Sequence, residues 1–375
     1  FVIHSYHKTF GNFYGESDLR AAYECYSEDT EILTEDGWIL LKDLPRELRV
    51  ATLNPDIGAL EYNKQRRYYK YPYRGKMFHQ SGRFVDFLVT PNHRNWIRPA
   101  NSLRFRFVES HSLKRHFQVK RDAVWQGIEQ EWFTLPAIEY QQAISNQFGR
   151  NYSTKVTVVP ERQIKMDDWL AFFGIWLAEG HTHRMKRGNR QASVGITQNV
   201  GEKLESIAET VKRCGFSFCV NGQKGKKRAV IISDLQLYSH LFQFGKSHDK
   251  FLPKELKVLS PRQLKILFDA MMMGDGRQTD GHHGCQYTTS SKQLADDVSE
   301  IMLKMGFAAN VSLDQSDKRF GGPIWIVSRN KKKIEATACN TREDRREWID
   351  YDGHVYCIEV ENHLVYVRRN GKACW

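Results

Sequence analysis

The stretch "DDWLAFFGIWLAEGH" (residues 167–181) is an apolar run of helix length that ends in an acidic residue, Glu179, followed by glycine. A second stretch, "QLKILFDAMMMGDGR" (residues 263–277), ends in the same way at Asp275. Apolar residues occupy nearly every side of each run, which predicts two buried helices. Two runs with the same ending indicate an internal repeat, which would decide the fold of the middle of the chain.

The segments after the two runs match as well. Thr197 lies 18 residues after the first acid, and Thr288 lies 13 residues after the second. Gly215 and Gly306, each followed by Phe, lie 36 and 31 residues after the same acids. The difference is five at both landmarks, so the second copy corresponds to the first with five residues removed from one turn.

Each run carries small residues four positions apart, Gly174 and Ala178 in the first, Ala270 and Gly274 in the second. Such positions share one helix face and allow two backbones to approach closely. If the helices pack in parallel, the two acids meet at one end, where unpartnered carboxylates would repel and a shared cation would hold them. For one copy alone, a buried helix with a glycine cap and a solvated acid would be the simpler interpretation.

Bulk properties restrict the class of protein. The chain has 375 residues, too long for one average domain, and 56 Lys and Arg against 44 Asp and Glu give a net charge of +12. This excess favours a polyanionic partner such as nucleic acid. No apolar run is long enough to span a membrane. The seven scattered cysteines contain no CxxC pair, so we expect a reducing, cytoplasmic location without disulfides or structural zinc.

The two ends of the chain differ from the middle. Alternating apolar residues and turn signals predict strands in "CYSEDTEILTEDGW" (25–38), "FVDFLVTPNHRNWIRPA" (84–100) and "GHVYCIEVENHLVYV" (353–367). The middle, by contrast, reads as helices with strands between them. The sequence therefore predicts a mixed α/β domain inserted into an all-β domain.

The middle resembles the LAGLIDADG homing endonucleases in "FFGIWLAEG" and "LFDAMMMGDG", over about 180 residues. The resemblance implies two αββαββα pseudo-repeats in a monomer that cuts both strands of double-stranded DNA at a long asymmetric site. It further implies that Glu179, Asp275, Gly180 and Gly276 bind Mg²⁺, which would activate water at the scissile phosphate.

The same resemblance places a lysine beside each acid. Lys250, in "HDKFLPKEL", matches the position in intein-borne members, and Lys331, Lys332 or Lys333 would serve the other half, with Lys332 chosen. The β-ribbons would lie in the major groove. Basic residues of two predicted hairpins are the expected DNA contacts: Arg184, Lys186, Arg187, Arg190, Lys224, Lys226, Lys227 and Arg228. A solvated charged hairpin is the alternative for each of them.

The ends resemble the Hint protein-splicing domain of inteins, in the order Cys25, "TPNH", "VYCIEVENH". The resemblance implies that the Cys25 thiol attacks the Glu24 carbonyl in an N–S acyl shift. His93 would protonate the departing nitrogen, Thr90 would hydrogen-bond nearby, and Cys357 and His363 would border the site. Many inteins carry Asp at position 357, so Cys357 either tunes Cys25 or acts as a second nucleophile.

Together the resemblances predict a horseshoe-like all-β Hint domain interrupted by an α+β endonuclease. Residues 1–24 would be an N-extein flank, 25–155 and 343–375 the Hint domain, and 156–342 the endonuclease. Residues 101–155 are either a DNA-contacting extension or a structural hairpin.

Inteins usually end in Asn, whereas this chain stops at "NGKACW" with Asn370 as its last asparagine. We therefore expect thioester formation with the extein segment but no completed splicing. Two alternatives remain: an endonuclease whose Hint part is only structural, and a LAGLIDADG protein that binds nucleic acid without cutting it.

Overall fold

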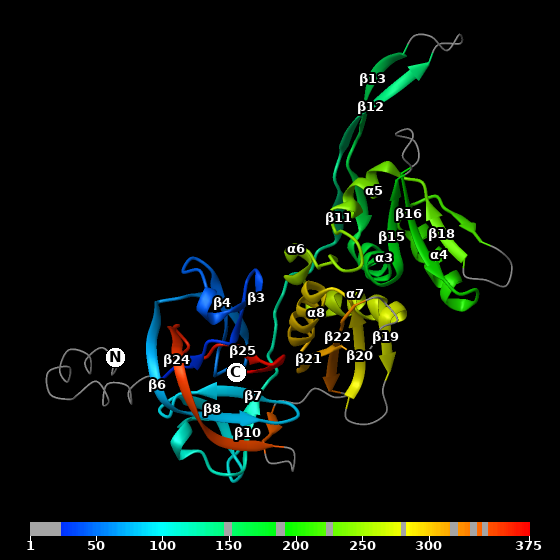
Figure 1. Cartoon of the computed structure of the whole chain (residues 1–375). Coiled ribbons are helices and arrows are strands. Elements are labelled where there is room, and N and C mark those ends of the chain that lie inside the picture. Colours follow the sequence, from blue (N-terminus) through cyan, green and yellow to red (C-terminus); the bar gives the residue numbers. More distant parts are fainter. Residues whose placement is uncertain are drawn as a thin grey trace.

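A β-rich part, built from both ends of the chain, and an α/β part between them make up the molecule (Figure 1). The computed structural model describes residues 24–145, 152–184, 192–222, 228–278, 283–315, 322–330, 336–339 and 344–375. Within these residues, no helix combines the length and apolar character needed to cross a membrane.

A closed barrel forms the centre of the β-rich part. Its strands, in order around the barrel, are β1 (Tyr26–Ser27), β24 (Arg345–Glu359), β6 (Arg67–Ser81) and β7 (Asp86–Val89). The two long strands, β6 and β24, are 15 residues each and pair in antiparallel register along their whole length. Because β6 and β24 come from opposite ends of the sequence, the barrel closes only when the two ends meet.

Further strands complete this part. One sheet has the order β23 (Ala336–Ala338), β10 (Phe117–Lys120), β8 (Arg94–Pro99) and β9 (Arg106–Glu109). The others are β2 (Glu31–Thr34), β3 (Gly37–Leu40), β4 (Arg49–Leu53), β5 (Leu60–Lys64), β25 (Val367–Arg369) and β26 (Lys372–Cys374), with short 3₁₀ turns η1 (Leu41–Asp43) and η2 (Ser110–Ser112). The turn expected at residues 35–37 joins β2 to β3, and Gly37 adopts the positive φ of 111° that it requires.

The α/β part consists of two units. The first contains α3 (Met166–Glu179), β15 (Gly180–Arg184), β16 (Ala192–Gln198), α4 (Glu202–Arg213), β17 (Cys219–Asn221), β18 (Arg228–Ile232) and α5 (Leu235–Phe242). After a short helix, α6 (Lys254–Lys257), the second contains α7 (Pro261–Asp275), β19 (Gly276–Gln278), β20 (His283–Thr289), α8 (Lys292–Lys304), β21 (Ala309–Asp314) and β22 (Ile324–Asn330).

Strand order repeats between the units: β15-β16-β18-β17 in one and β19-β20-β22-β21 in the other. Gly180 pairs with Ile196 in the first, and Gly276 pairs with Tyr287 in the second, so the five-residue offset appears in the register. The expected final helix differs between the copies. The first unit ends in α5, whereas in the described part of the second unit β22 is followed by β23.

Helices α3 and α7 pack against each other at their small residues. A Cβ on Gly174 would lie 2.7 Å from the Cβ of Ala270, and one on Gly274 would lie 2.5 Å from the Cβ of Ala178. Contacts this close leave no room for larger side chains, and they hold the C-terminal ends of both helices side by side. The surrounding core includes Trp169, Phe172 and other buried residues of both units.

A long two-stranded arm leaves the α/β part. Strands β12 (Ile138–Ser145) and β13 (Tyr152–Val159) pair over eight positions and extend away from the rest of the molecule (Figure 1). Below them, β11 (Trp132–Leu135) pairs with β14 (Arg162–Lys165), which leads into α3. Residues 101–145 are thus divided between the β8–β10 sheet and this arm.

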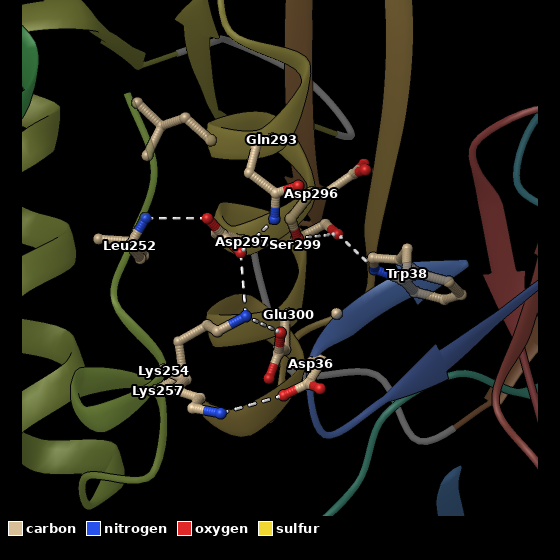
Figure 2. A network of polar contacts seen from close by, with 12 residues as sticks. Asp36, Trp38, Leu252, Lys254, Lys257, Gln293, Asp296, Asp297, Ser299 and Glu300 are labelled. Carbon is tan, nitrogen blue, oxygen red and sulfur yellow. Dashed lines mark hydrogen bonds and ion pairs between the residues drawn. The ribbon is translucent and has the colours of Figure 1, made fainter. Parts of the chain in front are cut away.

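Helix α8 joins the two parts. Trp38 of β3 donates a hydrogen bond of 3.2 Å from Nε1 to the hydroxyl of Ser299, and Lys254 pairs with Asp36 at 3.4 Å (Figure 2). Strand β21 also pairs with β26, so a sheet of ten strands continues from one part into the other. Both faces of α8 are therefore buried, one on each part.

Charges inside this junction are paired. The Lys257 ammonium donates to Asp297 at 3.0 Å and to Glu300 at 2.9 Å, and all three side chains are at most 4% exposed (Figure 2). Burial of these charges is tolerated because each has an opposite charge in contact.

Candidate functional sites

Two groups of polar residues stand out, one at the ends of α3 and α7 and one at Cys25. At the first, both helices end in an acid and both chains continue directly into a strand. A Cβ on Gly274 would lie 2.8 Å from Cγ of Glu179, so the Glu179 side chain passes beside the end of α7, next to Asp275. The glycines after the acids are needed for space, because a Cβ on Gly276 would lie 2.3 Å from the Met272 carbonyl oxygen.

Lys250 holds the end of α3. Its buried ammonium donates to the carbonyl oxygens of Trp176 at 3.0 Å, Leu177 at 2.8 Å and Gly180 at 2.8 Å. These carbonyls lie at the helix C-terminus, where a cation is electrostatically favourable. Burial lowers the pKa of Lys250 to about 8, and the charges of Asp275 and Glu179 act in the opposite direction.

The acid pair carries excess negative charge. The surrounding protein and the neighbouring charge of Glu179 raise the pKa of Asp275 to about 7, and Lys250 offsets part of this effect. Because Asp275 is exposed at the surface, we regard the Glu179 charge as the more important cause. A carboxyl group in this state gains from a cation that both acids can share.

The donor set fits a small hard cation that keeps much of its own water. Two carboxylates from matched helix ends are the type of ligand that Mg²⁺ takes, with water or phosphate oxygens filling its remaining positions. In the described ranges, no cluster of three or more His, Cys, Asp or Glu provides a cage made of protein alone. The Gly180 carbonyl, one of the expected metal ligands, accepts the hydrogen bond from Lys250.

One residue of this site was missed in the sequence. Gln198, at the end of β16, lies with its Nε2 3.4 Å from the Glu179 carboxylate. It ends the matched segment "GITQ" of the first copy, so the repeat already brought it toward the acid.

The expected DNA contacts are only partly described. Arg184 is exposed at the end of β15, and Arg228 begins β18 with its side chain half-buried. The remaining basic residues of this prediction lie outside the described residues: Lys186, Arg187, Arg190, Lys224, Lys226, Lys227 and Lys332.

At the second site, Thr90 contacts the peptide group before Cys25. The backbone N–H of Cys25 donates to Thr90 Oγ1 at 2.9 Å, and Thr90 N–H donates to the Cys25 carbonyl at 3.0 Å. Cys25 is 1% exposed and Thr90 is fully buried. The Glu24–Cys25 amide nitrogen is therefore held by a side-chain hydroxyl that only the tertiary fold brings to it.

His93 lies on the same side. Its ring packs edge-on against Tyr26, with centroids 4.4 Å apart. Burial lowers the pKa of His93 to about 4, and a hydrogen bond to the Glu24 backbone opposes this shift. The imidazole is consequently neutral near pH 7 and close to the Glu24 peptide. Arg94, which sequence reasoning missed, donates to the Glu24 carboxylate at 2.7 Å.

Cys357 faces Cys25 across two antiparallel strands. The printed register pairs Tyr26 with Tyr356, and one step further along the ladder Cys25 stands opposite Cys357. Burial raises the pKa of Cys25 well above its usual value, and contact with the Cys357 thiol raises it further. His363, in contrast, is exposed in the turn after β24, where its φ is 52°.

Comparisons with known proteins give similarities of limited coverage. No protein-family model matches the chain. It is 30% identical over 93% of its length to an ATP-dependent Clp protease proteolytic subunit of Chlamydomonas moewusii, and 28% identical over 94% to a DNA-directed RNA polymerase subunit beta C-terminal section of Stigeoclonium helveticum. The chain spans only 35% and 36% of those relatives.

Among solved structures, the homing endonuclease I-DmoI in complex with DNA and Mn matches 44% of this chain and 89% of its own, with 13% identity and a TM-score of 0.34. The homing endonuclease I-WcaI, bound to its DNA recognition sequence, matches 44% of this chain and 76% of its own, with 13% identity and a TM-score of 0.30. The AceL NrdHF class 3 split intein matches 56% of this chain and 99% of its own, with 12% identity and a TM-score of 0.23.

Proposed function

We propose that the chain is an intein that carries a LAGLIDADG homing endonuclease. The α/β part, in this proposal, hydrolyses double-stranded DNA with a divalent cation, and the β-rich part cleaves the Glu24–Cys25 peptide bond. The observation that carries the proposal is the acid pair, two carboxylates brought together from matched ends of two repeated helices.

The relatives support an inserted element. Their printed names describe a protease subunit and a polymerase subunit, which have no chemistry in common, yet each is similar to this chain over nearly its whole length. The similar region makes up about a third of each relative. A segment common to two such different proteins is better explained as an insertion than as the working part of either.

In the endonuclease, Glu179 and Asp275 would hold the cation, with Mg²⁺ as the expected ion. When bound, it would activate water and neutralise charge at the scissile phosphate. Lys250 fixes the end of α3 and so the direction of Glu179, and its ammonium supplies positive charge beside both acids. Gln198 orients the Glu179 carboxylate through its side-chain amide.

Peptide cleavage would use the groups around Cys25. The Cys25 sulfur attacks the Glu24 carbonyl carbon, the carbon–nitrogen bond breaks, and a thioester with a free Cys25 amine results. The thiol proton passes to the departing nitrogen, and neutral His93 is placed to carry it. Thr90 Oγ1 holds the N–H of that nitrogen and keeps the peptide in position.

DNA cleavage is tested on supercoiled plasmids with a randomised insert, in the presence and absence of Mg²⁺. We expect nicked and linear products with the wild-type chain, and none with Glu179→Gln or Asp275→Asn. Asp269→Asn removes an exposed carboxylate from the same helix and should leave cleavage intact. Cleavage by either acid variant, or none by the wild type, would contradict the proposal.

Thioester formation is tested with hydroxylamine, which should release a fragment of residues 1–24. Cys25→Ala should abolish release, and Cys219→Ala, which alters an exposed thiol on β17, should not. If no fragment appears while DNA is cleaved, the β-rich part is only structural. If DNA is bound but not cut, the chain is a nucleic-acid-binding protein.

A further inference from the structure

Tyr287 lies directly beneath the acid pair. On β20 its backbone pairs with Gly276, the residue that follows Asp275. The side chain is fully buried in the core shared by α3 and α7. Its hydroxyl has no hydrogen-bond partner among the residues that the structure describes.

The matching position in the first unit shows that this hydroxyl is specific to one half. Ile196 pairs with Gly180 as Tyr287 pairs with Gly276, and it is also fully buried. The core therefore accepts an apolar side chain at this position. A phenol in its place adds one polar group, at the half that carries Asp275.

Both carboxylates lie within electrostatic reach of that hydroxyl. Burial raises the pKa of Tyr287 well above its usual value, and the charges of Asp275 and Glu179 raise it further. The hydroxyl thus stays protonated and can donate its hydrogen. A buried donor without a protein acceptor needs a carboxylate oxygen or a water to accept it, and the acids and the water around a bound cation are the acceptors at this end of the core.

We propose that Tyr287 is a positioning residue of the cation site, donating from its hydroxyl, directly or through one water, to the acid pair when a divalent cation is bound. The inference rests on the proposed function, because it requires that Glu179 and Asp275 bind a cation. It makes the two halves inequivalent: the donor beneath Asp275 has an isoleucine as its counterpart beneath Glu179.

Titration of the full-length chain with Mn²⁺ in a calorimeter tests the inference, with Tyr287→Phe as the variant. Phenylalanine keeps the ring and removes only the hydroxyl. We expect the dissociation constant for Mn²⁺ to rise about tenfold, as is typical when a group that orients a metal ligand is lost. An affinity unchanged within about twofold would overturn the inference.

Unfolding of the same proteins separates positioning from ordinary packing. Without Mn²⁺, Tyr287→Phe should be as stable as the wild type, because no protein hydrogen bond is lost, and its stabilisation by Mn²⁺ should be smaller. Tyr366→Phe is the matched control, since its hydroxyl donates to the Arg121 carbonyl at 3.2 Å in the β-rich part. It should lose stability and keep its Mn²⁺ affinity.

The outcomes also distinguish this inference from the proposed function. If the wild type binds no Mn²⁺ and Glu179→Gln behaves identically, the acid pair is not a cation site and both ideas fail. If the wild type binds Mn²⁺, Glu179→Gln does not, and Tyr287→Phe binds as tightly as the wild type, only the role of Tyr287 is refuted. A loss of stability in Tyr287→Phe without Mn²⁺, with unchanged affinity, would show a purely structural residue.

Discussion

Replacing Gly174 with alanine tests the close packing that brings the acids together. A Cβ at this position would lie 2.6 Å from the Leu267 carbonyl oxygen and 2.7 Å from the Cβ of Ala270. Non-bonded carbon atoms pack at about 3.5–4.0 Å, so α3 and α7 would have to separate by about 1 Å. Neither obstructing atom can move away by changing a rotamer, because one belongs to the backbone and the other is a Cβ.

The expected free-energy change follows from two opposing contributions. Overpacking costs about 1–3 kcal/mol, and the upper end applies here because the neighbours are rigid. Alanine is favoured over glycine within a helix by about 1 kcal/mol, which offsets part of that cost. We therefore expect Gly174→Ala to lower the free energy of unfolding by about 2 kcal/mol.

Urea unfolding followed by tryptophan fluorescence measures this change, since Trp169 and Trp176 both lie on α3. Gly322→Ala is the control, because nothing lies within 4 Å of a Cβ at that position. It should change stability by less than about 0.5 kcal/mol. A Gly174→Ala variant as stable as the wild type would refute the close approach of the two helices.

Three further predictions concern other sites. Lys257→Met should destabilise the chain by about 3–5 kcal/mol, because it leaves two buried carboxylates at the α8 junction without their cation, whereas Lys265→Met, at an exposed pair, should change stability by less than about 0.5 kcal/mol in the same urea assay. Thr90→Val should slow hydroxylamine-dependent release of residues 1–24 at least about tenfold, and an unchanged rate would exclude a role for its hydroxyl. His93 has a folded pKa of about 4, below the ordinary 6.5, so the unfolded chain binds its proton first and stability falls between pH 6.5 and 4, by at most about 3 kcal/mol. His93→Gln should lose this part of the acid sensitivity in denaturation midpoints measured across that range.

Much of the acid-pair site could be predicted from sequence because its signals are local. Each acid ends an apolar run, and the small residues of α3 and α7 mark the helix faces that meet. Gln198 was missed as a partner of Glu179, although it stands in a matched segment of the repeat. Tyr287 gave no sequence signal, because a tyrosine in a predicted strand is usually a core residue; only its burial without an acceptor distinguishes it.

The site at Cys25 was less accessible to sequence reasoning. A resemblance suggested Thr90 and His93, but the direction of the Thr90 hydroxyl toward the Cys25 N–H depends on strands β1 and β7 pairing. Arg94, which holds the Glu24 carboxylate, has no motif that would reveal it. The fully buried network around α8 was likewise invisible, since its charges read as an ordinary solvated helix face.

By itself the sequence determined the repeat, the two acids and the division into a β-rich and an α/β part, because periodicity and spacing are properties of neighbouring residues. The tertiary structure alone decided which side chains share a site. Lys250 reaches α3 across 70 to 74 residues of chain, and Thr90 reaches Cys25 across 65. Such contacts depend on register, helix approach and burial, which arise only when distant segments exclude water together.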